Sequence, residues 1–528
     1  MCGISFCWGK CPSTLKKKKF NERFKNLLAR GPDSTRLESF KIRNGAEEYN
    51  ALLGFSRLAI QGTGPEAEQP FTQSNGNKLM VNGEIYNARK LAAAQELQVH
   101  SSDCLSVLKL LETMELVDVC RQLDGDFAIV YINISKKTIQ LARDPYGVRP
   151  LYYARYENGS NAVASELKGL WGLGQMVTCM QVEPGTVLTI PLSQFAMTTQ
   201  RWHQVPWLKN PAMRCPVIAR TSIFRVLKAA VKKRLVCNSQ VEIGACLSGG
   251  LDSSVIVALA VSYLARDRPG YRLKTYSIGM PGSPDIEAAR KVASFLKTDH
   301  HEIFVSPDEC LSAIPEVIRA IESYDITTVR ASVGNYLVGK YIRENTPGVK
   351  VVLNGDGSDE ILGGYKYMRA APSDLAFEQE TTRLLENIHC YDVLRSERCM
   401  AAHGLESRSP FLDRQFVALA RSIPTVMLRP SDTMIEKYIL RSVMLLALPL
   451  DIAMRPKEAF SDGISHPDSS WHEKTKAEAS RLGFTEAQWY RYEFDKHYCL
   501  KGAETIPGPW MPRFVRGATD PSARTLTI

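Results

Sequence analysis

The sequence predicts two domains of different class: an α+β domain made largely of short strands, followed by an α/β domain built on a doubly wound parallel sheet. Before about residue 190, short apolar runs alternate with turn signals, and long helical patterns are few. After about residue 220, strand and helix patterns alternate in the order that parallel β-α-β units require. Between these parts lies a stretch with four prolines, which predicts a linker.

The first domain is predicted to span residues 2–190. Its strand signals are short apolar runs bounded by turn residues such as Asn82-Gly83. The strands predicted in this part are Lys78–Val81, Ala128–Ile134, Thr138–Ala142 and Val187–Ile190.

The linker is predicted over residues 191–220 and the second domain over residues 221–528. This domain opens with apolar residues at helical spacing from Ile223 to Leu235. Because parallel strands need a crossover connection, usually a helix, the alternation that follows predicts a doubly wound sheet. The predicted strands are Val241–Leu247, Leu273–Gly279, His301–Val305 and Val349–Leu353, and the predicted helices are Ser253–Arg266 and Ile286–Lys297.

The composition is that of an ordinary globular protein. Apolar residues make up 44% and charged residues 23%, which excludes a disordered or fibrous chain. The net charge of +10 is spread along the chain apart from the run Lys16–Lys19, so it predicts attraction for anionic substrates and no nucleic-acid binding. The 13 cysteines show no C-x-x-C spacing, which indicates free thiols in a reducing compartment. No apolar run approaches the roughly 18 residues of a membrane span, so a cytoplasmic protein without membrane contact is expected.

Cys2 is a candidate N-terminal nucleophile. Its side chain is small, so removal of Met1 is expected and would leave a thiol and a free α-amine on one residue. The amine has a reference pKa of about 7.7–8.0, so it can serve as the base that activates the thiol. Taken alone, a cysteine at this position is also typical of an incidental small residue.

Further motifs follow Cys2 in a fixed order, and with them the first 190 or so residues resemble the glutaminase domain of class II (N-terminal nucleophile) glutamine amidotransferases. The resemblance implies an α/β/β/α sandwich that hydrolyses the side-chain amide of glutamine. The motifs are Arg30-Gly31-Pro32-Asp33, Arg57-Leu58-Ala59-Ile60, Asn82-Gly83-Glu84-Ile85-Tyr86-Asn87, Ser102-Asp103 and Leu123-Asp124-Gly125-Asp126-Phe127-Ala128.

The chemistry of these residues fits the roles that the resemblance implies. The Asn82 side chain and the Gly83 backbone would donate to the tetrahedral oxyanion. Arg57 suits the α-carboxylate of glutamine, and Glu84 and Asp103 suit its α-ammonium. The implied glutamine-binding set is Arg57, Leu58, Ala59, Ile60, Gln61, Asn82, Gly83, Glu84 and Asp103, of which Gln61 replaces an apolar residue of the family.

The segment Cys246–Ser254 is a glycine-rich loop between a predicted strand and a predicted helix. Its backbone N–H groups and the helix N-terminus favour an anion, and the lysine of the P-loop motif is absent. The run Ser-Gly-Gly-Leu-Asp-Ser resembles the pyrophosphate-holding loop of ATP pyrophosphatases, which transfer AMP to a substrate. That resemblance makes Asp252 a ligand for Mg²⁺.

The rest of the chain resembles glutamine-hydrolysing asparagine synthetases. The matching segments are Ser277–Met280, Ser283–Asp285, Tyr324–Ser332, Gly355–Glu360, Ala402–Glu406, Arg408–Asp413, Arg455–Gly463 and Ala518–Thr525. The resemblance implies that glutamine, aspartate and ATP are the substrates and that the enzyme is a homodimer. The implied residues are Leu247, Ser248, Gly249, Gly250, Asp252, Ser253, Ile278, Asn354 and Gly355 for ATP; Thr327, Thr328 and Arg330 for aspartate; Asp252 and Asp359 for Mg²⁺; and Cys2, Asn82, Gly83, Arg330, Asp356 and Lys457 for catalysis.

The implied reaction joins ammonia from glutamine to aspartate through β-aspartyl-AMP and releases AMP, pyrophosphate and glutamate. One departure bears on it: Asp356 stands where the family usually has glutamate, one methylene longer. Two alternatives stay open. An amidotransferase for another acid would differ around Thr327–Arg330, and a silent paralogue with a binding role is opposed by the presence of Cys2 and Lys457.

Overall fold

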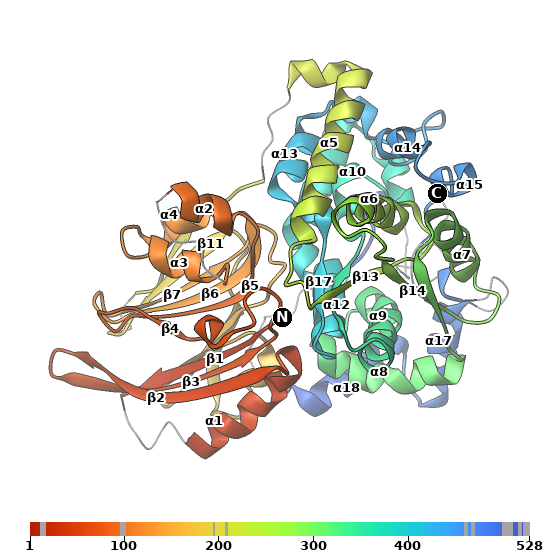
Figure 1. The fold of residues 1–528 in the computed structure, drawn as a ribbon. Helices are drawn as coiled ribbons and strands as arrows, with labels where there is room; N and C mark the ends of the chain where they lie inside the picture. Colours follow the sequence, from red (N-terminus) through yellow and green to blue (C-terminus); the bar gives the residue numbers. More distant parts are fainter. Residues whose placement is uncertain are drawn as a thin grey trace. The chain divides into compact units, whose positions relative to one another are not determined.

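The computed structural model describes residues 1–10, 17–94, 102–193, 196–205, 210–458, 463–465, 470–498, 510–515 and 520 (Figure 1). The chain divides into two compact units, each described by itself below. One unit contains Met1–Gln204 and the short segment Ala401–Leu405, and the other contains Val205–Met400 and Glu406–His497. Over the described ranges, every helix is too short or too polar to cross a membrane.

The first unit contains two six-stranded antiparallel sheets. In spatial order, the first sheet consists of β10 (Met176–Gln181), β8 (Tyr152–Tyr156), β9 (Asn161–Ala164), β1 (Gly3–Gly9), β3 (Glu47–Arg57) and β2 (Ser34–Asn44). The second consists of β12 (Thr198–Arg201), β11 (Thr186–Pro191), β7 (Thr138–Arg143), β6 (Gly125–Asn133), β5 (Lys78–Ile85) and β4 (Phe71–Thr72).

The two sheets pack face to face through one apolar core, to which Phe6 and Leu53 of the first sheet and Val130 of the second contribute. A second core joins the other face of the second sheet to three short helices. On the first sheet, Phe24 packs against Gly54 of β3. The α/β/β/α sandwich is therefore confirmed. The helices are α1 (Lys17–Phe24), α2 (Ala88–Ala94), α3 (Leu105–Leu110) and α4 (Leu116–Gln122).

The second unit contains a five-stranded parallel sheet with β13 at its centre. Ala245 of β13 pairs with Thr275 on one side and with Leu353 on the other. Figure 1 shows α6 and α7 on one face of this sheet and α8 and α9 on the other, so the doubly wound arrangement is confirmed. In spatial order, the strands are β15 (Asp299–Phe304), β14 (Lys274–Gly279), β13 (Glu242–Cys246), β16 (Val349–Leu353) and β17 (Glu406–Arg408), and the four helices are α6 (Leu251–Asp267), α7 (Pro284–Leu296), α8 (Pro307–Ile321) and α9 (Ile326–Asn345).

Further helices of the second unit surround this sheet and carry several residues of its site. They are α5 (Pro216–Arg234), α10 (Ser358–Leu362), α11 (Asp374–Asn387), α12 (Asp392–Ala401), α13 (Arg414–Ser422), α14 (Tyr438–Met444), α15 (Leu450–Ala453), α17 (Trp471–Arg481) and α18 (Glu486–His497).

The described residues of the proline-rich stretch 191–220 include the strand β12, a short 3-10 helix at Pro211–Arg214 and the start of α5. The strand β12 pairs with β11 through Thr198–Arg201, and α5 begins at Pro216. Proline suits the first turn of a helix because the N–H that it lacks has no partner within the helix there. Pro191 ends β11, Pro211 begins a short 3-10 helix and Pro216 begins α5, so these three prolines lie at the ends of regular elements, and Pro206 lies outside the described residues.

Candidate active sites

The first candidate site lies in the first unit, where Cys2 directly precedes β1. The Cys2 backbone nitrogen donates to Asn82 Oδ1 at 2.7 Å, so the side chain of Asn82 ties the start of β1 to β5. Asn82 is fully buried, and its Nδ2 group has no hydrogen-bond acceptor within the described part of the chain. A buried donor without an acceptor is costly unless a ligand completes it. This is the property expected of an oxyanion-hole donor.

Gly83 follows Asn82 on β5 in a conformation that only glycine adopts easily. Its φ is +148°, and a Cβ atom added there would lie 2.0 Å from the carbonyl oxygen of Asp126 on the paired strand β6. The absence of a side chain is therefore a steric requirement at this position.

The groups predicted to hold the two ends of glutamine are buried and engaged. Arg57, at the end of β3, is 6% exposed and lies 2.7 Å from the carboxylate of Glu68. Glu84 is 4% exposed and accepts a hydrogen bond from the amide of Gln61. Asp103 accepts the backbone N–H of Ile85 at 2.6 Å. The remaining predicted residues of this pocket, Leu58, Ala59 and Ile60, follow β3 directly and are buried.

The second candidate site is a cavity of about 230 Å³ in the second unit. It lies at the carboxyl ends of β13, β14 and β16, where parallel sheets commonly bind ligands. The structure brings together residues predicted from segments far apart in the sequence. The predicted residues that line this cavity are Leu247, Ser248, Asp252, Ser253, Ile278, Thr327, Thr328, Arg330, Asn354, Gly355, Asp356, Asp359 and Lys457.

Gly249 and Gly250 form the turn of the phosphate loop and are absent from that lining set. Gly249 has φ +73°, and an added Cβ atom would lie 2.4 Å from the backbone nitrogen of Ala289 in α7. The loop is fixed by hydroxyl groups, since Ser253 Oγ accepts from the Ser248 N–H at 3.2 Å and lies 3.1 Å from Ser248 Oγ. The turn therefore approaches α7 closely and presents a preorganised loop at the N-terminus of α6.

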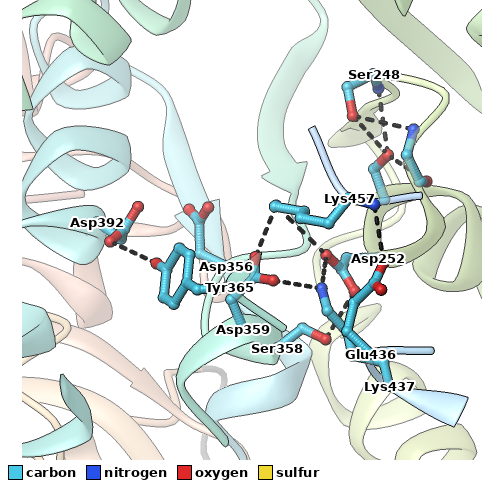
Figure 2. A network of polar contacts seen from close by, with 12 residues as sticks. Ser248, Asp252, Asp356, Ser358, Asp359, Tyr365, Asp392, Glu436, Lys437 and Lys457 are labelled. Carbon is cyan, nitrogen blue, oxygen red and sulfur yellow. Dashed lines mark hydrogen bonds and ion pairs between the residues drawn. The ribbon is translucent and has the colours of Figure 1, made fainter. Parts of the chain in front are cut away.

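Two aspartates and two lysines form an alternating cluster beside this loop (Figure 2). Lys437 Nζ lies 2.6 Å from Asp252 Oδ2 and 2.6 Å from Asp359 Oδ1. Lys457 Nζ lies 2.7 Å from Asp359 Oδ2 and 4.0 Å from Asp252 Oδ2. Ser358 completes the cluster by donating to Asp252 Oδ1 at 2.7 Å.

The lysines stabilise the ionised form of Asp359. Burial favours the neutral form of Asp359, but Lys437 and Lys457 outweigh it and hold the pKa of Asp359 below its usual range. In the same way, burial opposes the charge of Lys457, but Asp359 and Asp252 raise the pKa of Lys457 above its usual value. The carboxylate of Asp359 is therefore ionised at neutral pH. Two carboxylates near a phosphate loop fit Mg²⁺, which takes one or two protein carboxylates together with phosphate oxygens.

Lys437 was not predicted from the sequence. It precedes α14 with a left-handed backbone (φ +56°), and its side chain is 1% exposed. A lysine outside a helical or strand pattern carries no local signal of burial, so only the folded chain reveals its two partners. Glu436 beside it accepts the backbone N–H of Lys457 at 2.8 Å, which joins the two lysine-bearing segments.

Asp356 follows β16 and lines the cavity. Arg395 Nη2 lies 3.4 Å from Asp356 Oδ1 and 2.6 Å from Asp392 Oδ1. Burial raises the pKa of Asp356 although Arg395 opposes the shift. A carboxyl with a raised pKa is a better proton acceptor than an ordinary aspartate. The sequence did not point to Arg395 or Asp392, because their role depends on a contact between α12 and the end of β16.

The residues predicted for aspartate gather at the N-terminus of α9. Asp325 caps this helix by accepting from the backbone N–H and the hydroxyl of Thr328, at 2.8 and 2.7 Å. The hydroxyl of Thr327 is buried and finds no hydrogen-bond partner among the described residues. A helix N-terminus with an unused hydroxyl suits an anionic group such as a carboxylate or phosphate.

Arg330, one turn into α9, is 2% exposed, and two carboxylates hold its guanidinium. Its Nε and Nη2 donate to Glu486 at 2.8 and 2.5 Å. Its Nη1 and Nη2 donate to Asp520 at 3.0 Å each. Arg330 thus also anchors two later parts of the chain at the wall of the cavity.

Comparison with known proteins identifies the family of each part of the chain. Residues 223–377 and 369–501 match the family model of asparagine synthase, and residues 1–206 match that of a glutamine amidotransferase domain. The chain is 39% identical to a probable glutamine-hydrolysing asparagine synthetase of Acanthamoeba polyphaga mimivirus, over 95% of each chain. It is 37% and 38% identical to the glutamine-hydrolysing asparagine synthetases of Mus musculus and Rattus norvegicus, over 100% of this chain and 99% of each relative. The chain therefore belongs to the family of glutamine-hydrolysing asparagine synthetases.

Proposed function

We propose that this protein makes asparagine from aspartate and ATP, with ammonia released from glutamine. The observation that carries the proposal is the single cavity in which the phosphate loop at Ser248, the α9 N-terminus at Thr327 and Lys457 meet. The phosphate loop suits a triphosphate, and the N-terminus of α9 suits an acidic substrate. Lys457 suits the phosphoryl group that is transferred.

In the first unit, the Cys2 thiolate attacks the amide carbon of glutamine and forms a glutamyl thioester. With Met1 removed, the nitrogen that now donates to Asn82 would be the α-amine that takes the thiol proton and passes it to the leaving ammonia. The Asn82 amide and the Gly83 N–H stabilise the oxyanion during attack. Water then hydrolyses the thioester and releases glutamate.

In the second unit, the β-carboxylate of aspartate attacks the α-phosphorus of ATP. The new bond joins carboxylate oxygen to phosphorus, the bond to the pyrophosphate oxygen breaks, and β-aspartyl-AMP results. Lys457 stabilises the charge that builds on the α-phosphate. Asp252 and Asp359 would hold Mg²⁺, which neutralises triphosphate charge when bound.

Ammonia then attacks the activated carbonyl of β-aspartyl-AMP, and AMP leaves. Adenylation is needed because a free carboxylate has no good leaving group. We assign the proton released by the attacking ammonia to Asp356, whose raised pKa suits an acceptor. The resemblance that implies these steps also makes a homodimer the expected assembly. No disulfide joins the described cysteines, which is consistent with a cytoplasmic protein.

The test is the production of asparagine, AMP and pyrophosphate from aspartate and Mg·ATP, with glutamine or with ammonia. Both nitrogen sources should support synthesis by the unchanged protein. Cys2→Ala should abolish the glutamine reaction and keep the ammonia reaction, whereas Lys457→Met should abolish both. A chain that forms no AMP with either nitrogen source would refute the proposal and favour a silent paralogue. AMP formation with another acid in place of aspartate would favour the alternative amidotransferase.

A further inference from the structure

Both charged groups that would hold the ends of glutamine are bonded to other side chains of the first unit. Arg57 Nη1 lies 2.7 Å from Glu68 Oε1, and Glu84 accepts a hydrogen bond from the Gln61 amide. Arg57 and Glu84 are 6% and 4% exposed, whereas the Glu68 side chain is 29% exposed and Gln61 is half-buried, so the charged group that would bind glutamine is the buried member of each pair. Glu68 offers Arg57 a carboxylate, and Gln61 offers Glu84 an N–H donor. Free glutamine would present the same two kinds of group.

The segment that follows β3 supplies both of these internal partners. Arg57 donates to the carbonyl of Gly64 at 3.2 Å and to the carbonyl of Gly62, so the segment between Gln61 and Glu68 folds back over the arginine. The hydroxyl of Ser34 lies 2.9 and 3.0 Å from the two carboxylate oxygens of Glu68. The glutamate is therefore fixed from two sides and is not a freely moving surface group.

We propose that Gln61 and Glu68 are internal competitors of glutamine and set the KM of the glutaminase reaction. This inference rests on the proposed function, which places the α-carboxylate at Arg57 and the α-ammonium at Glu84. Glutamine then has to displace Glu68 from Arg57 and Gln61 from Glu84 before Cys2 can attack. Gln61 and Glu68 contact the groups proposed for the two ends of glutamine, and the Cys2 backbone nitrogen donates to a different side chain, so they would act on binding. Both are specificity-determining residues that weaken glutamine as a nitrogen donor relative to ammonia.

The test measures glutamate release against glutamine concentration for Glu68→Gln, Gln61→Leu and the double variant in the full chain. Loss of one competing hydrogen bond of this kind should lower KM about tenfold. The value of kcat should stay within about twofold, because chemistry at saturation is unchanged. Glu66→Gln is the matched control, since Glu66 is an exposed acid on the same turn and its change should leave KM unaltered. A KM that is unchanged or raised in both single variants would overturn the proposal.

Glutamine binding to the Cys2→Ala protein gives a readout that does not depend on turnover. Isothermal titration should show tighter glutamine binding when Glu68→Gln or Gln61→Leu is added to Cys2→Ala. Equal or weaker binding in both would reject the inference even if KM had changed. Failure of the proposed function has a different signature, the absence of asparagine synthesis with ammonia, and the titration is independent of that reaction.

Discussion

The ammonium group of Lys437 lies 2.6 Å from the carboxylate of Asp252, although 185 positions separate the two residues in the chain. The same ammonium lies 2.6 Å from Asp359. One buried lysine thus joins the phosphate loop after β13 to the helix α10 after β16. Its contacts keep two acidic groups together beside the site proposed for ATP.

Replacement of Lys437 by Met should destabilise the second unit by about 3 kcal/mol, because it removes the buried ammonium that pairs with both Asp252 and Asp359 and leaves Lys457 alone to balance two carboxylates. Synthesis with ammonia should fall at least about 100-fold, since the phosphate loop loses its fixed geometry. Thermal unfolding and ammonia-driven asparagine formation measure the two effects.

Lys291→Met is the matched control for that change, since Lys291 pairs with Asp451 at the surface with both side chains more than half exposed. Its cost should stay below about 1 kcal/mol. Equal costs for the two variants would show that the Lys437 cluster is not a stabilising element.

Replacement of Asp356 by Asn should lower asparagine formation about 100-fold, because the amide cannot accept the proton of the attacking ammonia. Pyrophosphate release should continue, since the adenylation step precedes that proton transfer. Asp356→Glu restores the usual family residue and should retain synthesis with ammonia. Parallel assays of pyrophosphate and asparagine separate the steps, and a loss of both products in Asp356→Asn would contradict the assignment.

Replacement of Asn82 by Ala should lower the glutaminase kcat about 10²–10³-fold through loss of an oxyanion donor. The ammonia reaction should be unaffected. A fall in both reactions would mean that Asn82 supports the fold rather than the oxyanion. Steady-state kinetics with glutamine and with ammonia on one preparation make the comparison.

Asp285, on α7, provides a test by pH. Burial raises its pKa to about 6 despite an ion pair of 2.8 Å with Arg455. The pKa of Asp285 is about 3.8 in the unfolded chain and about 6 in the folded chain. Between these two pH values the folded chain keeps a proton that the unfolded chain has lost, so the free energy of unfolding falls as pH rises. The total change from this group is about 3 kcal/mol. Asp285→Asn should therefore gain stability relative to the unchanged chain between pH 4 and pH 7 in denaturant titrations. A difference in the free energy of unfolding between the two proteins that stays constant from pH 4 to pH 7 would contradict the raised pKa of Asp285.

The sequence predicts the β-α-β part of the fold well, since buried parallel strands appear as continuous apolar runs. The strand Val349–Leu353 is found with the predicted bounds, and Val241–Leu247 differs from β13 by one residue at each end. The phosphate loop is equally visible, because its glycines and serines act through local backbone geometry. Such local motifs thus indicate groups whose role depends on the backbone at their own position in the chain.

Long-range contacts limit what the sequence can tell about the sites. The two carboxylates on Arg330 come from positions 486 and 520, and no pattern around residue 330 indicates them. The role of Lys437 cannot be predicted for the same reason, because its partners Asp252 and Asp359 are distant in the chain and the sequence around Lys437 shows no helical or strand periodicity. Gln61 is visible as a departure from the family pattern, but its bond to Glu84 emerges only when β3 and β5 lie in place.

The Asn82 side chain accepts the backbone N–H of Cys2 with its oxygen, while its own N–H group has no acceptor among the residues that the structure describes. A rotation of the amide by 180° would exchange Oδ1 and Nδ2. It would remove the hydrogen bond from Cys2 and the donor for the oxyanion together. Both features therefore depend on a single orientation of one buried amide.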